Sequence, residues 1–470
     1  MEVNAPNVIL LTVDCLRCDH LGCYGYFRDT SPNINNLASK GALFLEAISN
    51  GGATSYSFPS ILASALPPLK GGEDREILQR STTLAEFLKE AGYHTAAFHS
   101  NPSLARPFNY GKGFNIFEDS LGKTDTILKQ KFKVEGKLVP KVLSLEALRF
   151  GRLVVRFLAK LWRLHEFFYM MAGPPIMRAE ELTKRALQSL VAHQGKLFLW
   201  LHYMDVHSPY MPFPRYLSQF RTQSVSQRKM VTLSHKILEN PGQLSPSEVT
   251  MVVDLYDASI KYIDDAIGRL LDSLASDLSN TIVIVSADHG EEFGEHGKFS
   301  HETLYDGLVH VPLIIAGPGI KGGTLVKQQV SLIDLVPTIA DLVGIDNAQS
   351  FRGKSLLPVV EGEREAINGT ISTNIPPRQR LFIAYRVPGW KYILTESLDG
   401  SDAVLAEEVY DLGSDPGETR NLHGMDVEEA ERFELEARNK LLQFKQLKSE
   451  EKTAYEKQRI KTKLNKLGKL

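Results

Sequence analysis

The sequence predicts an α/β fold in which a large, mostly parallel sheet is flanked by helices. Three continuous apolar runs are typical of buried strands and cover residues 7–13, 196–204 and 281–287. Helical patterns separate these runs, at residues 83–92, 177–190 and 259–274. Strands that alternate with helices favour parallel pairing, with helices on both faces of the sheet.

The composition is that of an ordinary soluble globular protein. The chain has 470 residues, of which 43% are hydrophobic and 23% charged. This length leaves room for one large α/β domain with a smaller domain appended. The formal net charge of -2 gives no overall attraction to nucleic acid or to membranes, and no nucleic-acid partner is expected.

The cysteines and the N-terminal segment predict a cytoplasmic protein. Cys15, Cys18 and Cys23 fall within a short stretch, which argues against a disulfide framework and for a reducing compartment. A metal or iron–sulfur centre is the alternative, but there is no fourth cysteine, so small buried side chains at a strand end are favoured. We expect no signal peptide and no membrane-spanning helix.

Acidic and imidazole side chains follow all three predicted strands at the point where each strand ends, and the second run leads into Asp205 and His207. Asp14 comes directly after the first run, and Asp288 and His289 follow the third. Ligands bind beyond the carboxyl ends of parallel strands, so these side chains should meet at one edge. Singly, each is typical of a turn or a helix cap. Together, two carboxylates and an imidazole predict a site for a divalent ion such as Zn²⁺ or Mn²⁺.

Six segments in consistent order carry a family resemblance, from Asn7 to about Leu422. They are NVILLTVDCLRCDHLGCYGY, TSPNINNLASKGALFLEAIS, the hydroxyl-rich turn GGATSYSFPSILASAL, HYMDVHSPYMP, SADHGEEFGEHGKFSHETLYDGLVHVPLIIAGPG and VYDLGSDPGETRNL. Together they resemble the sulfatase branch of the alkaline phosphatase superfamily. The resemblance implies an alkaline-phosphatase-like sandwich with a smaller C-terminal α+β subdomain. It also implies attack by a metal-bound nucleophile on sulfur or phosphorus.

The expected domain organisation follows from this resemblance. A sulfatase-like catalytic domain should cover residues 1–345, with a helical insertion at about 121–180. The smaller subdomain should cover 346–425, and a helical, basic tail 426–470.

The turn at residues 51–66 supplies the candidate nucleophile. Small hydroxyls after a glycine pair are first of all typical of a turn and a helix N-cap. When ILAS at 61–64 is laid on the end of the family's short helix, the resemblance places the nucleophile at Thr54 and the family's serine at Ser57. A shift of one residue would select Ser55 instead.

Three departures from the family pattern alter the expected chemistry. Thr54 replaces the Cys or Ser that is converted to formylglycine, and Phe58 replaces an arginine. Threonine nucleophiles occur in the superfamily's phosphodiesterases and phospho-group transferases, so this departure favours phosphorus. Cys15 stands where many sulfatases carry a second metal-binding aspartate. The absence of this aspartate, together with the presence of His289, favours a single softer ion, Zn²⁺ or Mn²⁺. Ca²⁺ is an alternative, and a second metal ion is left open.

The expected site has four metal ligands and two further catalytic residues. The ligands are Asp14, Thr54, Asp288 and His289. His207 and His301 are candidates to bind an oxygen of the transferred group or to protonate the leaving group. A satisfied structural histidine is the alternative for each.

Five other residues are weaker candidates. His202 and Asp205 are expected to orient the loop that carries HSPY. His296 is either a second-site ligand or a turn residue. His99 and Asn101 follow a further predicted strand and are weaker still.

The segment at 148–168 places five cations on one helical face beside apolar residues. They are Arg149, Arg152, Arg156, Lys160 and Arg163. Such a helix predicts peripheral contact with the inner face of a membrane. The alternative is a lid helix whose cations face solvent or an anionic substrate. The segment from Val427 is expected to be a polar, partly disordered helix with a basic end that could reinforce such contact.

These features predict a metal-dependent, sulfatase-like hydrolase that cleaves sulfate or phosphate esters through Thr54, with phosphorus favoured. The substrate could be linked to a glycan or a lipid. One alternative is a phospho-group transferase acting on a lipid or glycan, and another is a true sulfatase that uses an unmodified hydroxyl. A third is a degenerate family member that binds an anion without turnover.

Overall fold

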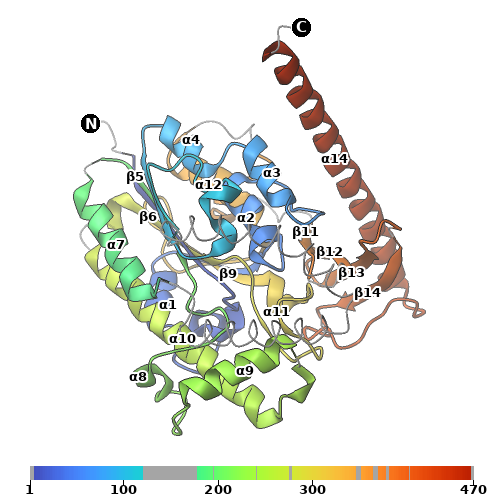
Figure 1. Ribbon diagram of the computed structural model, residues 1–470, viewed down its shortest axis with the longest axis horizontal. Coiled ribbons are helices and arrows are strands. Elements are labelled where there is room, and N and C mark those ends of the chain that lie inside the picture. The colour runs from blue at the N-terminus through green and yellow to red at the C-terminus, as the bar shows by residue number, and fades with distance from the viewer. Residues whose placement is uncertain are drawn as a thin grey trace, which may run out of the picture.

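The computed structural model describes residues 5–119, 177–193, 195–239, 241–274, 278–345, 351–363, 369–376, 380–401 and 403–466. Over these residues the chain forms an eight-stranded sheet flanked by helices, then a four-stranded antiparallel sheet and a long C-terminal helix (Figure 1). The predicted α/β fold with a smaller C-terminal part is therefore confirmed.

The central sheet has the strand order β10-β2-β9-β6-β1-β5-β3-β4. Its strands are β1 (Asn7–Val13), β2 (Ala42–Ile48), β3 (His94–His99), β4 (Ile116–Glu118), β5 (Leu197–Tyr203), β6 (Thr281–Ala287), β9 (His310–Ala316) and β10 (Thr324–Ser331). Only β9 runs antiparallel to its neighbours, β2 and β6, among the pairings described. The sheet is mostly parallel, as predicted.

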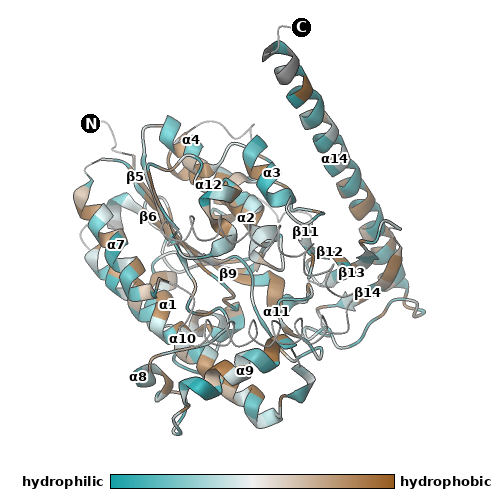
Figure 2. Ribbon diagram, viewed as in Figure 1, coloured by the Kyte–Doolittle hydropathy of each residue, from teal (hydrophilic) through white to brown (hydrophobic). Residues whose placement is uncertain are grey.

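The three predicted apolar runs are β1, β5 and β6, which lie side by side at the centre of the sheet. Every side chain of β5 and β6 is buried, because helices cover both faces of these parallel strands. Figure 2 shows hydrophobic residues along these strands and polar residues on the outward sides of the surrounding helices.

Helices flank the sheet on both sides. They are α1 (Pro32–Ser39), α2 (Thr54–Ala63), α3 (Glu73–Arg80), α4 (Leu84–Glu90), α7 (Ala179–Ala192), α8 (Pro214–Leu217), α9 (Gln227–Glu239), α10 (Pro246–Ser273), α11 (Asp306–Val309), α12 (Leu335–Leu342) and α13 (Leu357–Val360). In Figure 1, α1, α7 and α10 gather on one side and α2, α3, α4 and α12 on the other. The helix α10 begins well before the predicted residue 259, because Ser245 and Glu248 form a capping box at its start.

The smaller sheet consists of β11 (Thr370–Asn374), β12 (Arg380–Val387), β13 (Trp390–Ser397) and β14 (Val404–Asp411). It packs against the first half of α14 (Glu428–Lys466). The packing side chains of the helix recur every three or four residues and are Ala430, Phe433, Ala437, Leu441 and Phe444. The sequence predicted a polar, partly disordered tail, whereas this half of the helix belongs to the second core. The second half first contacts α3, where Lys448 pairs with Glu73 and Glu451 pairs with Arg80, and its end extends away from the body (Figure 1).

Two predictions concern parts of the chain that the structure leaves out. The basic segment 148–168 lies outside the described residues, and so does most of the insertion expected at 121–180. Membrane contact and a cytoplasmic location therefore stay predictions. No helix among the described residues is both long and apolar enough to cross a membrane.

Candidate active site

The ends of β1 and β6 bring the predicted metal ligands together. Asp14 and Asp288 are completely buried, and His289 is 1% exposed. The His289 Nε2 atom lies 3.6 Å from Asp14 Oδ1 and 3.6 Å from Asp288 Oδ2. One ligand atom from each of the three residues lies within 4.8 Å of the others. The expectation that these strand ends meet at one edge of the sheet follows directly from their parallel pairing.

The electrostatics of this cluster favour a bound cation. Burial raises the pKa of Asp288 to about 8, and the neighbouring charge of Asp14 adds to the effect. Burial would also raise the pKa of Asp14, but nearby histidines, His207 foremost, lower it well below its usual range. Two carboxylates so close together cannot both be ionised without a compensating positive charge. A divalent ion would supply that charge.

The orientation of the side chains fits the same interpretation. His289 donates from Nδ1 to the Gly290 carbonyl at 2.8 Å, and burial lowers its pKa, so a neutral Nε2 lone pair faces the carboxylates. The Oδ2 atom of Asp288 has no hydrogen-bond partner within the described chain. Oxygen, oxygen and nitrogen donors converging in this way can hold a metal ion.

Thr54 is the first residue of α2 and lies at the edge of this cluster. The N-cap of α2 is Ala53, and no hydroxyl of the turn caps the helix through its side chain. The interpretation of the turn as a hydroxyl cap is therefore wrong. Ser57 instead donates to the Thr54 carbonyl at 3.2 Å. The Thr54 hydroxyl is left to face the site, and it lowers the pKa of the neighbouring Asp288.

The glycine pair before Thr54 is required by close backbone approach. A Cβ atom on Gly51 would lie 2.4 Å from the Ser57 nitrogen, and one on Gly52 would lie 2.7 Å from the Thr303 carbonyl oxygen. Gly51 also pairs with Thr373 in β11. The smaller sheet therefore supports the turn that carries the candidate nucleophile.

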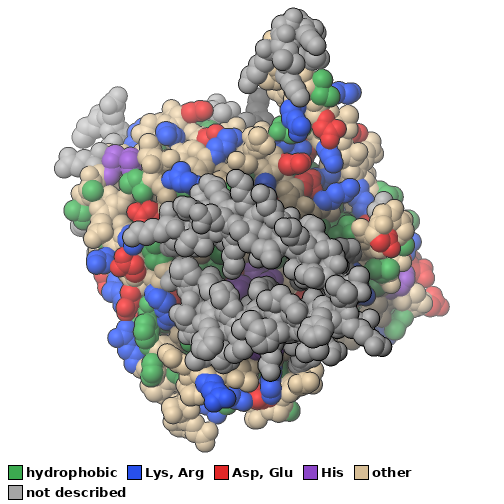
Figure 3. All heavy atoms as spheres, viewed as in Figure 1, with side chains coloured by type: hydrophobic (Ala, Val, Ile, Leu, Met, Phe, Trp, Pro, Cys, Tyr) green, Lys and Arg blue, Asp and Glu red, His purple; other side chains and the backbone are tan. Residues whose placement is uncertain are grey.

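Two further histidines, His207 and His301, lie beside the candidate metal ligands. The rings of His207 and His301 have centroids 5.6 Å apart, and His301 lies 5.1 Å from His289. The His301 Nδ1 atom is 3.8 Å from Glu291 Oε1. Burial alone would lower the pKa of His301, but the Glu291 carboxylate raises it, which favours a protonated ring. Figure 3 shows histidine side chains near the centre of this face of the molecule.

His202 lies closer to the site than the sequence suggested. It was expected only to orient a loop, yet its Nε2 atom is 3.3 Å from Asp14 Oδ2. Asp205 does have an orienting contact, because its carboxylate accepts a 2.9 Å hydrogen bond from the Ala179 backbone N–H at the start of α7.

The remaining histidine candidates lie elsewhere. His296 stacks on Tyr305 and donates from Nε2 to backbone carbonyls at 417 and 418, which is the role of a turn residue. His99 is buried beside Phe117 and Trp200, and burial lowers its pKa to about 3.

Sequence reasoning missed the roles of three residues that reach the site. Asn101, a weak candidate, donates to both Asp14 and Thr54. Glu291 is fully buried behind His301. The Cys15 thiol, with a backbone φ of +60°, donates to Asp14 Oδ1 at 3.1 Å. Cys15 also groups with histidines as a candidate metal ligand. The Asp-His-Gly-Glu string could have indicated Glu291. No local sequence pattern at Asn101 or Cys15 indicates where the side chain points.

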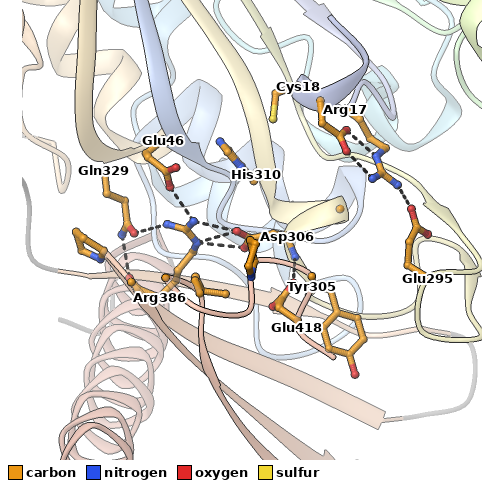
Figure 4. A pocket seen from close by; sticks show the side chains of 18 of the residues that line it. Arg17, Cys18, Glu46, Glu295, Tyr305, Asp306, His310, Gln329, Arg386 and Glu418 are labelled. Atoms are coloured by element: carbon orange, nitrogen blue, oxygen red, sulfur yellow. Dashed lines mark hydrogen bonds and ion pairs between the residues drawn. The ribbon is translucent and has the colours of Figure 1, made fainter. Parts of the chain in front are cut away.

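A cavity of about 630 Å³ lies between the central and smaller sheets, and its lining does not include the candidate metal ligands or Thr54. Figure 4 shows that its charged side chains point toward one another. Arg386, for example, donates to Asp306 at 2.9 Å and to Glu46 at 2.7 Å. This cavity is thus a junction lined by paired charges, distinct from the strand-end site.

Comparison with known proteins gives consistent matches. The family described as Sulfatase matches residues 6–345, and the one described as N-sulphoglucosamine sulphohydrolase, C-terminal, matches residues 294–447. A sulfatase of Formosa agariphila is 25% identical over 456 residues, which cover 89% of this chain and 83% of the relative.

Two solved structures share the fold. A protein in complex with its substrate D-glucosamine-2-N,6-O-disulfate superposes with a TM-score of 0.69 at 18% identity, covering 94% of this chain and 98% of the other. The phosphonate monoester hydrolase of Agrobacterium radiobacter gives 0.66 at 18% identity, covering 94% and 95%.

Proposed function

Because this chain belongs to the sulfatase family of hydrolases, within the alkaline phosphatase superfamily, we propose that it cleaves sulfate or phosphate esters through Thr54. The observation that carries the proposal is the convergence of one hydroxyl with two buried carboxylates and an imidazole at the carboxyl ends of the central strands. We further propose that phosphate esters are the better substrates.

The residues Asp14, Asp288 and His289 would hold one divalent ion, with Zn²⁺ or Mn²⁺ favoured by the mixed oxygen and nitrogen donors. Such an ion supplies charge that lowers the pKa of a neighbouring hydroxyl and neutralises an oxygen of the transferred group. The Cys15 thiol is a further candidate ligand, and burial together with nearby carboxylates raises its pKa.

Two displacement steps complete the reaction. Thr54 Oγ1 gives its proton to solvent water and attacks sulfur or phosphorus, which forms a threonine ester and breaks the bond to the substrate's alcohol oxygen. His301, whose pKa the Glu291 carboxylate raises, gives its proton to that oxygen. Water then attacks the threonine ester, restores the hydroxyl and releases sulfate or phosphate. The N-terminus of α2, where Thr54 lies, favours negative charge in both steps.

The preference for phosphorus rests on the nucleophile. A threonine cannot yield the aldehyde of formylglycine, so the covalent intermediate must be hydrolysed as an ordinary ester. Proteins of the same fold include one solved with a sugar disulfate and a phosphonate monoester hydrolase, so the fold itself accommodates sulfur and phosphorus. We therefore base the proposed preference for phosphate esters over sulfate esters on the chemistry of Thr54.

The test is a parallel assay of p-nitrophenyl sulfate, p-nitrophenyl phosphate and bis(p-nitrophenyl) phosphate with Zn²⁺, Mn²⁺ or Ca²⁺ added. We expect turnover of at least one phosphate ester and a smaller rate on the sulfate. Thr54→Ala should lower kcat by several orders of magnitude, whereas Ser55→Ala, one residue along α2, should cost far less. Near-normal turnover in Thr54→Ala with loss in Ser55→Ala would move the nucleophile by one position.

A further inference from the structure

Asn101 lies in the loop after β3, and its side chain is almost completely buried, at 3% exposure. Its Oδ1 atom accepts a 2.9 Å hydrogen bond from the Ser103 backbone N–H, at the start of a short 3-10 helix, Pro102–Leu104. Since this contact occupies the oxygen, the NH₂ group of the amide faces the opposite way, toward the end of β1.

Besides His202 Nε2, at 3.5 Å, the amide nitrogen of Asn101 reaches two oxygen atoms of the site at once. It lies 2.8 Å from Asp14 Oδ2 and 3.3 Å from Thr54 Oγ1. An amide nitrogen carries two hydrogens and can only donate. Asn101 therefore donates one hydrogen bond to the carboxylate and the other to the hydroxyl oxygen.

His202 holds the same carboxylate oxygen from β5. Its Nδ1 atom lies 3.0 Å from Thr12 Oγ1, and Thr12 accepts a 3.0 Å hydrogen bond from Trp200 Nε1. The Thr12 proton has two acceptors within reach, His202 Nδ1 and the Leu201 carbonyl at 3.3 Å. A carboxylate can only accept, so the 3.3 Å contact between His202 Nε2 and Asp14 Oδ2 is a hydrogen bond when the ring carries a proton on Nε2.

The two oxygens of Asp14 consequently face different neighbours. Oδ1 faces His289 Nε2 at 3.6 Å, on the side of the candidate metal ligands. Oδ2 is held by the donors of Asn101 and His202. Asn101 thus links the carboxylate that would bind an ion to the hydroxyl that would attack the substrate.

Building on the proposed role of Thr54 as the nucleophile, we propose that Asn101 is a further catalytic residue, which donates a hydrogen bond to Thr54 Oγ1 and stabilises that oxygen after it has lost its proton. A hydrogen bond to a charged oxygen is roughly twice as strong as one to a neutral oxygen. The stabilisation is therefore larger in the reacting state than in the resting state, which is the condition for catalysis. The next turn of α2 offers no such donor, because Phe58 is apolar and packs against Trp200 and His202.

The chain offers a matched control for this contact. Asn33 also donates from its amide to a buried carboxylate, Asp264 Oδ2, at 2.8 Å, but it lies on α1, and its amide hydrogen bonds go to Asp264 and not to Thr54. Asn101→Ala and Asn33→Ala each remove one amide-to-carboxylate hydrogen bond. Only the first also removes a donor from the candidate nucleophile.

We expect Asn101→Ala to lower kcat by roughly 100-fold or more, the usual effect of losing one donor to a developing charge. KM for the best p-nitrophenyl ester should change little, and the Zn²⁺ content measured by elemental analysis should stay at the wild-type level. Asn33→Ala should lower the unfolding temperature and leave kcat unchanged. Asn101→Ser keeps a residue able to cap the 3-10 helix, so it reports on catalysis if the alanine variant fails to fold.

The outcomes separate this proposal from the proposed function. Loss of activity in Thr54→Ala with wild-type kcat in Asn101→Ser would overturn the role of Asn101 alone. Loss of kcat in both Asn101 variants together with loss of Zn²⁺ would show that Asn101 acts through Asp14, and would also overturn it. Wild-type turnover in Thr54→Ala would overturn the assignment of Thr54 as the nucleophile. Reduced kcat with retained Zn²⁺ in Asn101→Ser supports the proposal.

Discussion

At the scale of single residues, the site is built from buried groups whose charges oppose one another. Asp14 and Asp288 are both fully buried, and the His289 Nε2 atom lies 3.6 Å from an oxygen of each. Burial and the neighbouring charge of Asp14 raise the pKa of Asp288 well above its usual range, so the ionised carboxyl is disfavoured unless a cation is bound. Protons and a divalent ion should therefore compete for the cluster.

The first residue-scale prediction concerns metal binding. Asp14→Ala and Asp288→Ala should each abolish stoichiometric Zn²⁺ or Mn²⁺ binding, because each removes one of three converging ligands. Elemental analysis after dialysis would measure the metal content, and circular dichroism would check that the fold is retained. Asp205→Ala is a suitable control, since that carboxylate contacts the start of α7. Full occupancy in Asp288→Ala would exclude Asp288 as a ligand.

At the scale of elements, buried carboxylates also join helices. Asp264, on α10, accepts hydrogen bonds from the backbone N–H groups of Asn33 and Ile34 at the start of α1. It thus satisfies helix donors that have no partner within α1. Burial raises the pKa of Asp264 from 3.8 to about 6, even though these donors lower it. Ionisation of Asp264 therefore destabilises this junction progressively as the pH rises from about 4 through about 6.

This cost gives a prediction on pH and stability. Between pH 4 and 6 the folded state binds more protons at Asp264 than the unfolded state, so this group makes stability fall as pH rises. Asp264→Asn has no such ionisation. Relative to wild type, its free energy of unfolding should rise between pH 4.5 and 7.5 by about 2 kcal/mol, since one pKa unit corresponds to about 1.4 kcal/mol and part of the effect is already present at pH 4.5.

Urea unfolding at several pH values would measure this difference. Asp272→Asn, at an exposed position on the same helix, should run parallel to wild type across the range. A constant gap between wild type and Asp264→Asn would show that burial does not raise the pKa of Asp264 in the folded protein.

At the scale of the whole molecule, the smaller sheet is attached to the catalytic part through buried charges. Lys391, on β13, is completely buried and donates to Glu418 at 2.7 Å and to the Leu304 carbonyl at 3.1 Å. It also pairs with Asp306, at the start of α11. Burial would raise the pKa of Asp306, but Lys391 and Arg386 lower it well below its usual range. The ion pairs thus connect the two sheets at the cavity of Figure 4.

We expect Lys391→Met to lower the free energy of unfolding by about 3–5 kcal/mol, because it removes the cation paired with the buried Glu418 and one of the two cations paired with Asp306. Chemical denaturation would measure the change. Lys229→Met removes a lysine whose pair with Glu248 lies at the surface, and it should cost less than about 1 kcal/mol. Equal effects of the two substitutions would contradict a stabilising role for the buried network.

Much of the site could be predicted from the sequence, because its signals are local. Parallel strands that are buried on both faces must be continuous apolar runs, so β1, β5 and β6 are visible in the printed sequence. Residues directly after such strands must lie at one edge, which gave Asp14, Asp288 and His289. The ordered motifs gave the family, which the comparisons confirm, and the register that selects Thr54.

Only the tertiary structure decided the rest, because direction and contact depend on segments far apart in the chain. Asn101 is a weak candidate by sequence, yet the loop after β3 turns its amide toward Asp14 and Thr54. The glycine pair looked like a generic turn, but Ser57 and Thr303 leave no room for a Cβ there. Apolar residues are too sparse in α14 to reveal a core helix until β12 and β13 supply the facing side chains. Local pattern therefore determined which elements form and where their ends meet, whereas long-range packing determined which side chains act together.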